Sequence, residues 1–352
     1  MKRIVQILDS YSYGDGMGNH AGALLNALKA RGVDTQIYAK YVDPRLSHMG
    51  KNVAEYVPSQ EDVILYHLGA GSELNRKVTE YPGRLIINYH NITPPEFFAD
   101  YNPALEANCR AGYEDVKFLA DKVEMAISVS AYNSSELARM GYTCPLHQAP
   151  IVMDFSDYTK APDAATVEKY SDGVSNIVFV GRICPNKKHE DLMLDFYYYT
   201  KYFNPNSRLI LVGNYRGFEG YYLKLKKYAK KLGLTNVVFT GHIKFSQILA
   251  YYHTADLFLC ESEHEGFCIP LVEAMHFGVP IVAYDSSAIG ETLGTGGVLL
   301  REKNPRLTAS VMDQILRDES LRKTILEQQK ENLKRFDSKA VADRYMEFLL
   351  GD

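Results

Sequence analysis

The hydrophobic positions of this chain form two series in which short apolar runs alternate with longer amphipathic segments. Runs rich in Val and Ile predict strands, and the segments between them have the spacing of helices that bury one face. In the first half, we predict strands at residues 3–8, 35–39, 63–68, 85–89 and 125–129. In the second half, we predict strands at residues 177–180, 208–212, 237–240, 257–260 and 281–284. Strands and helices that alternate in this way build parallel sheets, so the pattern predicts two Rossmann-like α/β domains.

The boundary between the predicted domains lies where the alternation stops. Residues 153–175 are polar, contain Pro162 and lack a strand pattern, so we assign them to a linker region. A length of 352 residues also exceeds what one hydrophobic core usually supports. We therefore predict a first domain at residues 1–152 and a second at 176–335. From Asn304 to the end of the chain, the pattern is helical without further strands.

Composition narrows the class of protein. A net charge of -4 gives no global reason to expect a nucleic-acid partner. The lysine-rich stretch at residues 224–231 has helical spacing that turns Leu223 and Tyr228 inward, which favours a solvated face over a binding patch. The five cysteines are scattered without paired metal-ligand spacing and fit a reducing compartment. No apolar run reaches the ~18 residues of a membrane span, so we expect a cytoplasmic protein. Peripheral association of this protein with the inner face of the membrane is an alternative that the sequence does not decide.

The most informative segment follows the predicted strand at residues 257–260. Glu265 lies in a turn after this strand, and Glu273 lies about one turn into the next helix, which has Pro270 near its start. Ligands of open α/β sheets bind at the carboxyl ends of the strands. Two carboxylates there can bind neighbouring hydroxyl groups, while the helix N-terminus favours an anion. A nucleotide sugar offers both kinds of group.

The run E-G-F-C-I-P-L-V-E, residues 265–273, resembles the E-x7-E signature of the retaining glycosyltransferases of family four. The resemblance implies the GT-B fold, in which two Rossmann-like domains face each other across a cleft. It also implies that the last helix, residues 336–352, crosses back to the first domain. In this family the first Glu contacts the donor sugar and the second contacts the ribose hydroxyls. The donor-binding residues implied in this segment are Glu265, Gly266, Phe267, Cys268 and Glu273.

A basic motif, G-R-I-C-P-N-K-K-H, follows the predicted strand at residues 177–180. The family has an Arg and, about five residues later, a Lys that hold the donor diphosphate, and Arg182 and Lys187 match them. Arginine offers a planar fork for two phosphate oxygens, and lysine adds a mobile point charge. The family usually has Gly after this Lys, whereas this chain has Lys188. Lys188 is therefore an alternative ligand for the diphosphate.

A glycine-rich segment, Y-G-D-G-M-G-N-H-A-G, precedes the first predicted helix, at about residues 20–29. Glycines let backbone N–H groups approach a phosphate closely. The segment also satisfies a G-x-G-x-x-A dinucleotide pattern. We disfavour NAD because the glycines begin several residues after the strand, and the second strand ends without a carboxylate. The segment instead resembles the acceptor-domain loop that covers the donor diphosphate, which implies donor contacts from Gly16, Met17 and Gly18.

His90 follows the predicted strand at residues 85–89. By resemblance it matches a His near the donor sugar and the reacting centre, and the alternative is a His that binds a loop carbonyl. The catalytic residues that the resemblance implies are Arg182, Lys187, Glu265 and His90.

The resemblance implies a retaining, metal-independent hexosyltransferase. It would move a hexose from a UDP- or GDP-sugar to an acceptor glycan or glycolipid in polysaccharide or glycolipid synthesis. The chain has no Asp-x-Asp pair, so we expect no metal and no cofactor, and protein groups alone would stabilise the departing diphosphate. A sugar phosphorylase, a nucleotide-sugar epimerase and a non-catalytic binding protein are the alternatives. Three departures from the family pattern, at Glu261, Cys268 and His276, leave the identity of the sugar open.

Overall fold

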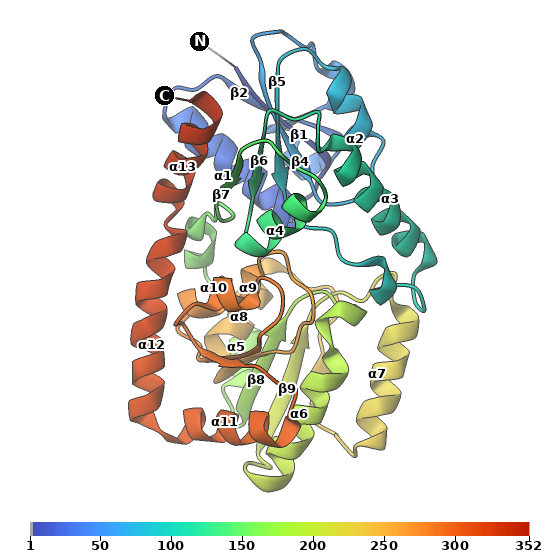
Figure 1. Ribbon diagram of the computed structural model, residues 1–352. Coiled ribbons are helices and arrows are strands. Elements are labelled where there is room, and N and C mark those ends of the chain that lie inside the picture. The colour runs from blue at the N-terminus through green and yellow to red at the C-terminus, as the bar shows by residue number, and fades with distance from the viewer. Residues whose placement is uncertain (1–2, 352) are drawn as a thin grey trace. The chain divides into compact units, whose positions relative to one another are not determined.

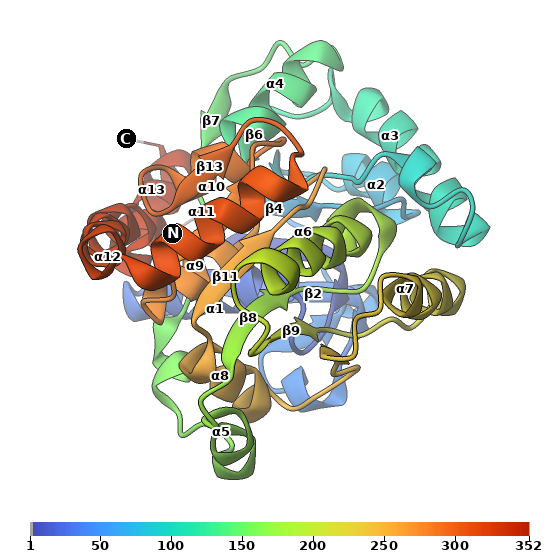
Figure 2. The ribbon, with the colours of Figure 1, turned by 90° about the horizontal axis from the view of Figure 1, so that it is seen from below.

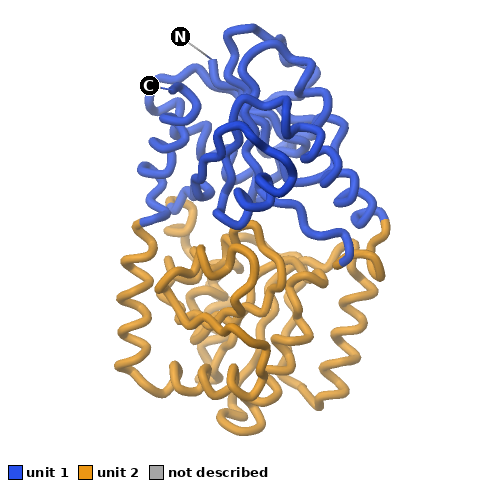
Figure 3. Tube along the Cα trace, viewed as in Figure 1, with its two compact units in different colours: residues 1–96, 104–155, 335–352 blue, residues 97–103, 156–334 orange. Residues whose placement is uncertain are grey.

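The computed structural model describes residues 3–351, which form two compact units (Figures 1 and 3). Within the described residues, the first unit comprises residues 3–96, 104–155 and 335–351, and the second comprises residues 97–103 and 156–334. Each unit is built on a parallel sheet with helices packed on it. The predicted fold class of two Rossmann-like α/β domains is confirmed.

The described part of the first unit has a seven-stranded parallel sheet in the order β3-β2-β1-β4-β5-β6-β7. Its strands are β1 (Ile4–Tyr11), β2 (Thr35–Val42), β3 (Gly50–Asn52), β4 (Val63–Leu68), β5 (Arg84–Tyr89), β6 (Met125–Ser128) and β7 (Leu146–Gln148). Its helices are α1 (Gly16–Ala30), α2 (Leu74–Lys77), α3 (Pro103–Leu119), α4 (Ala131–Arg139) and α13 (Ser338–Leu350). All five predicted strands are present, while β3 and β7 were not predicted because three residues are too few to show a period.

The C-terminal helix α13 belongs to the first unit. Val341, Tyr345 and Leu349 on one face of α13 join Leu24 and Leu28 of α1 in a buried core cluster. Their spacing of four residues brings the apolar side chains onto one face of the helix. The chain therefore returns from the second unit to complete the core of the first.

The described part of the second unit has a six-stranded parallel sheet in the order β10-β9-β8-β11-β12-β13. Its strands are β8 (Ser175–Val180), β9 (Ser207–Val212), β10 (Val237–Phe239), β11 (Leu257–Cys260), β12 (Ile281–Tyr284) and β13 (Val298–Leu300). Its helices are α5 (Ala164–Tyr170), α6 (His189–Tyr202), α7 (Glu219–Lys231), α8 (Phe245–Thr254), α9 (Ile269–His276), α10 (Ile289–Leu293), α11 (Pro305–Arg317) and α12 (Glu319–Leu333). Helices α6 and α11 lie side by side (Figure 2), and α9 packs against α12.

Two predictions about local structure were wrong. Residues 156–175, assigned to the linker, belong to the second unit and contain α5, which is tied to α8 by a hydrogen bond from the Asp163 N–H to the Ser246 carbonyl (2.9 Å). In α7 the buried side chains are Tyr221, Leu225 and Ala229, whereas Leu223 is 57% exposed. Two helical positions turn the side chain by about 200°, so Leu223 lies opposite the buried face.

No helix within residues 3–351 has the length and apolar character needed to cross a membrane.

The strand order places a topological switch point in each sheet. In the second unit, β8 pairs with β9 on one side and with β11 on the other, so the chain order reverses between β8 and β11. In the first unit, β1 has the same position between β2 and β4. Loops at the carboxyl ends of the strands diverge at such points and leave room for a ligand.

Candidate functional site

Lys187 and Glu265 meet at the switch point of the second unit. Lys187 ends a short 3₁₀ helix (Pro185–Lys187) after β8, and Glu265 lies in the loop after the neighbouring strand β11. Lys187 Nζ lies 2.5 Å from Glu265 Oε1. Asn186 joins the two loops, since its side-chain amide donates to the His264 carbonyl (3.1 Å) and its own carbonyl accepts from the Glu263 N–H (2.8 Å).

This ion pair is largely shielded from water. The side chains of Lys187 and Glu265 are 18% and 11% exposed. Burial alone would lower the pKa of Lys187, but the Glu265 carboxylate outweighs it, so the pKa of Lys187 lies above its usual value. The Glu265 N–H also donates to Ser287 Oγ (2.8 Å), which ties the loop to the segment after β12. The structure therefore confirms that Glu265 lies in a loop, and it places the cation predicted for phosphate beside it.

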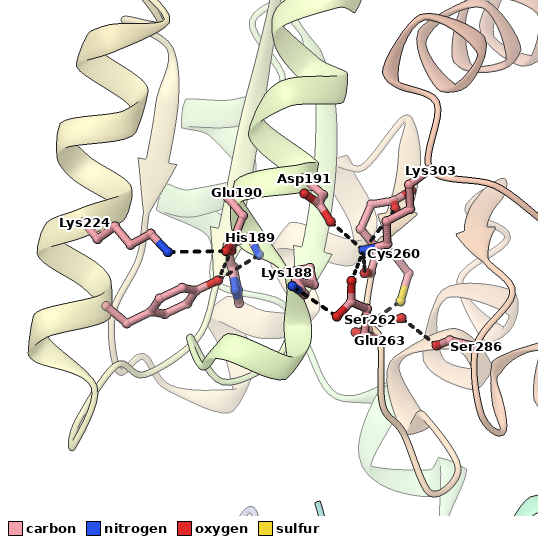
Figure 4. Close-up of polar contacts among 12 residues, drawn as sticks. Lys188, His189, Glu190, Asp191, Lys224, Cys260, Ser262, Glu263, Ser286 and Lys303 are labelled. Carbon is pink, nitrogen blue, oxygen red and sulfur yellow. Dashed lines mark hydrogen bonds and ion pairs between the residues drawn. The ribbon is translucent and has the colours of Figure 1, made fainter. Parts of the chain in front are cut away.

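Lys188 turns away from this pair. Its backbone is left-handed (φ 50°, ψ 50°), the conformation that glycine adopts without strain. Its ammonium group lies 3.1 Å from Glu263, which is also 3.1 Å from Lys303 (Figure 4). Lys303 in turn contacts Asp191 (2.5 Å). The structure thus separates the two candidate lysines, with Lys187 on Glu265 and Lys188 in a network around Glu263.

Arg182 is exposed and contacts a different loop. Its Nη2 donates to the Arg216 carbonyl (3.0 Å), and its guanidinium lies over the ring of the buried Phe218 at 4.9 Å. No hydrogen bond or ion pair among the described residues joins Arg182 to Lys187 or Glu265. Both predicted phosphate ligands therefore lie in the segment between β8 and α6, but their side chains contact different loops: Arg182 the loop after β9 and Lys187 the loop after β11.

Glu273 lies just over one turn into α9, as predicted, and is held by two tyrosines. Tyr158 donates to Oε1 and Tyr252 donates to Oε2, each at 2.6 Å. Burial raises the pKa of Glu273, and the two hydroxyl groups oppose this shift only in part. Each carboxylate oxygen has a second lone pair, so the oriented carboxylate keeps capacity for further hydroxyl donors. The sequence did not reveal either tyrosine, because Tyr158 lies in the predicted linker and Tyr252 in another helix.

The three residues after Glu265 differ in what they can offer a ligand. Phe267 is 5% exposed, and its carbonyl accepts from Thr292 Oγ1 (2.5 Å), so its ring serves the core. Cys268 is also buried and has a left-handed backbone (φ 71°) at the N-cap of α9. Gly266 is partly exposed. Because Phe267 and Cys268 are buried, little of either side chain is accessible to a nucleotide-sugar donor.

The glycine-rich segment of the first unit is not the predicted loop. Helix α1 begins at Gly16, so Gly16, Met17 and Gly18 form its first turn. The N-cap is Asp15, whose carboxylate accepts from the Gly18 N–H (3.0 Å). A Cβ on Gly18 would lie 2.8 Å from the Ser12 carbonyl oxygen, which accounts for glycine there by close packing. The Asp15 side chain therefore already accepts from the Gly18 N–H, so this N–H is not open to a phosphate of the donor.

His90 directly follows β5, as predicted, and lies in a cluster of buried polar groups. Its Nε2 is 3.0 Å from His67 Nδ1, and His67 Nε2 is 2.9 Å from Gln6 Oε1. Burial lowers the pKa of His90 to about 3, so its ring is neutral near pH 7. Met17 and His90 both border Gly69, which follows β4. Neither His67 nor Gln6 was predicted, although a His inside the apolar run of β4 is an unusual residue.

Comparison with known proteins relates part of this chain to glycosyltransferases. Residues 167–332, which include Lys187, Glu265 and Glu273, match the family model described as glycosyl transferases group 1. The chain is 25% identical over 275 residues to lipopolysaccharide 1,2-N-acetylglucosaminetransferase of Salmonella typhimurium, covering 76% of this chain and 66% of that protein. These findings support a group 1 glycosyltransferase.

Solved structures share the fold described above. Sucrose-phosphate synthase of Thermosynechococcus elongatus is similar with a TM-score of 0.77 and 16% identity, over 98% of both chains. Anabaena HepE in complex with UDP-glucose is similar with a TM-score of 0.78 and 18% identity, over 99% of this chain and 100% of HepE. The structural neighbours include GT-B glycosyltransferases, so the predicted fold is confirmed. The sequence alignments span only about half to two thirds of the length of the curated relatives.

Proposed function

We propose that the chain is a retaining glycosyltransferase. It moves a hexose-type sugar from a UDP- or GDP-sugar to a hydroxyl group of an acceptor glycan or glycolipid, without a metal ion. The observation that carries the proposal is the arrangement at the switch point of the second sheet, where Lys187 contacts Glu265 and Glu273 is oriented by two tyrosines. All three site residues lie within the segment that matches the family model.

Each group has a distinct role in the proposed site. Glu273 accepts hydrogen bonds from the ribose hydroxyls through its remaining lone pairs. Glu265 accepts from a hydroxyl of the donor sugar. Lys187 and Arg182 stabilise the charge that develops on the departing diphosphate. The loss of one preorganised donor of this kind typically costs ~3 kcal/mol of transition-state stabilisation.

The proposed reaction retains the anomeric configuration through attack on the face that the phosphate leaves. The bond between the anomeric carbon and the phosphate oxygen breaks, and the bond to the acceptor oxygen forms. The acceptor proton passes to the departing phosphate oxygen. This route needs no covalent nucleophile from the protein.

The relatives support the classes of donor and acceptor. HepE is described in complex with UDP-glucose, and the Salmonella relative is named for lipopolysaccharide. We therefore include in the proposal that this chain uses a nucleotide-sugar donor and a glycan or glycolipid acceptor.

The test is a set of UDP- and GDP-hexoses, each incubated with and without octyl hexosides as acceptors. We expect nucleoside diphosphate release that requires an acceptor, and a product with the anomeric configuration of the donor. Release that requires inorganic phosphate would indicate a phosphorylase, interconversion of the donors an epimerase, and binding without turnover a binding protein. Activity in excess EDTA tests the metal-free mechanism. Loss of activity that Mg²⁺ or Mn²⁺ restores would overturn it.

A further inference from the structure

Three histidines of the first unit, His20, His67 and His90, form a cluster whose rings lie 5.2 to 5.4 Å apart. One nitrogen from each lies within 4.8 Å of the others, a spacing that a metal ion could use. Both nitrogens of His20 already have partners, since Nδ1 accepts from the Val152 N–H (2.8 Å) and Nε2 contacts the Asn88 amide (2.9 Å). The facing nitrogens of His67 and His90 are at hydrogen-bond distance. The cluster is therefore better explained as a hydrogen-bond relay than as a metal centre.

Gln6 sets the direction of this relay. Its side-chain N–H donates to the Ala21 carbonyl (3.2 Å), so its oxygen is the atom that faces His67 Nε2 at 2.9 Å. An amide oxygen only accepts, so the proton of the His67 ring must be on Nε2. A neutral imidazole carries one N–H, which leaves His67 Nδ1 as an acceptor. Its partner His90 Nε2 must then donate, and His90 Nδ1 keeps its lone pair.

Burial keeps the relay neutral. Gln6 and His67 are 0% and 1% exposed, while His90 is partly exposed. Burial lowers the pKa of His67 and His20 well below the usual value, and the neighbouring histidines lower them further. The rings of His67 and His90 therefore stay neutral near pH 7, and each donates its hydrogen bond toward Gln6. Among Gln6, His67 and His90, only His90 is partly exposed.

We propose that Gln6 and His67 are positioning residues that hold His90 in the tautomer with the proton on Nε2 and a lone pair on Nδ1. His90 then accepts a hydrogen bond from a substrate hydroxyl and cannot donate one to a substrate oxygen through Nδ1. The assignment of a sugar hydroxyl as the partner rests on the proposed function. The tautomer itself is a property of the free protein and can be measured without substrate.

The test is long-range ¹H–¹⁵N correlation NMR on the full chain labelled with ¹⁵N-histidine, near neutral pH. In the wild type, we expect His90 to show a protonated Nε2 and an unprotonated Nδ1, and His67 to show the same pattern. A proton on Nδ1 of either ring, or a doubly protonated ring, would overturn the relay. Addition of one equivalent of Zn²⁺ should leave these resonances in place, whereas stoichiometric loss of the His67 and His90 signals would indicate a metal site instead.

Variants separate the relay from the reaction. His67→Phe removes the acceptor for His90 and should give a mixture of His90 tautomers, while His67→Gln supplies an acceptor and a donor and should restore the single tautomer. His20→Gln, in the same cluster but outside the relay, is the matched control and should leave the His90 tautomer unchanged. An unchanged tautomer in His67→Phe would refute the role of His67.

Turnover measurements test the role of His90 in the reaction separately from its tautomer. His67→Phe should lower turnover at saturating donor by about tenfold or more, with His67→Gln recovering most of it and free nucleotide affinity unchanged in both. If the tautomer is as stated but neither His67→Phe nor His90→Phe slows transfer, the substrate role of His90 is wrong while the relay stands.

Discussion

The ammonium group of Lys187 and the carboxylate of Glu265 lie 2.5 Å apart in a site that little water reaches. The free protein therefore holds its predicted phosphate ligand and its predicted sugar ligand as a preformed ion pair. A diphosphate that binds here must share Lys187 with Glu265, so the two roles are coupled through one contact. Substitutions at either position consequently affect stability as well as chemistry, and experiments must separate the two.

Lys187→Ala should lower turnover at saturating donor by roughly 100-fold or more, because it removes a preorganised charge from the departing diphosphate. It should also lower the free energy of unfolding by about 3 kcal/mol, because Glu265 is left buried without its partner. The double variant Lys187→Ala/Glu265→Ala should recover part of the stability and none of the turnover. Steady-state kinetics and urea unfolding provide the two measurements.

Lys188→Ala is the matched control for this prediction. The side chains of the Lys188 and Glu263 pair are 28% and 32% exposed, so its loss should cost at most about 1 kcal/mol and leave turnover within a few-fold. A sensitive Lys188 and a silent Lys187 would instead assign the phosphate to Lys188.

Tyr158→Phe and Tyr252→Phe should each weaken the binding of free UDP or GDP by about tenfold, because each removes a hydrogen bond that orients the Glu273 carboxylate. Glu273→Ala should weaken both the free nucleotide and the nucleotide sugar. Glu265→Ala should not weaken the free nucleotide, because Glu265 is assigned to the sugar and its removal leaves Lys187 available to the diphosphate. Isothermal titration calorimetry on the four variants measures these differences, and equal losses in Glu265→Ala and Glu273→Ala would refute the division of roles.

Local patterns predicted the strands and the loop position of Glu265, because each depends on residues close together in the sequence. The partners that orient the site could not be found in this way. Tyr158 reaches Glu273 across 115 residues, and His67 reaches Gln6 across 61. No spacing rule connects such pairs, since tertiary packing alone brings them together. The start of α1, in contrast, could have been predicted from the sequence. Asp15 directly precedes Gly16, and Asp is a preferred N-cap residue.

Replacement of Cys268 or Lys188 by glycine should leave stability nearly unchanged, whereas replacement by a β-branched residue should lower it. Both have positive φ values, 71° and 50°, a conformation that glycine adopts without strain. We expect Cys268→Gly and Lys188→Gly to change the free energy of unfolding by no more than about 1 kcal/mol. Cys268→Val and Lys188→Val should lower it by about 1 to 3 kcal/mol, because a β-branched side chain is strained in this conformation. Chemical denaturation measures all four, and equal effects of Gly and Val would show that backbone conformation does not decide these positions.

Glu261→Gln should make the protein more resistant to unfolding above neutral pH. Glu261 is 2% exposed and lies near the buried Asp195 on α6. Burial raises the pKa of Glu261 from its ordinary value of 4.5 to about 7, Lys303 opposes this shift, and Asp191 adds to it. Because the folded pKa is the higher one, the group favours folding fully below its unfolded pKa, and this contribution is lost as the pH rises through 7.

The amide in Glu261→Gln cannot ionise, so it removes this dependence on pH. The variant should therefore gain stability over the wild type on going from about pH 5 to about pH 8, by at most about 3 kcal/mol. Urea unfolding midpoints at the two pH values give the comparison, and Asp195→Asn should show a change of the same sign, since burial and then Glu261 raise the pKa of Asp195. If the wild type and Glu261→Gln lose stability equally over this range, the proton on Glu261 does not control it. Lys303, which lies 4.0 Å from Glu261, would then be the group that keeps the carboxylate charged in the folded protein.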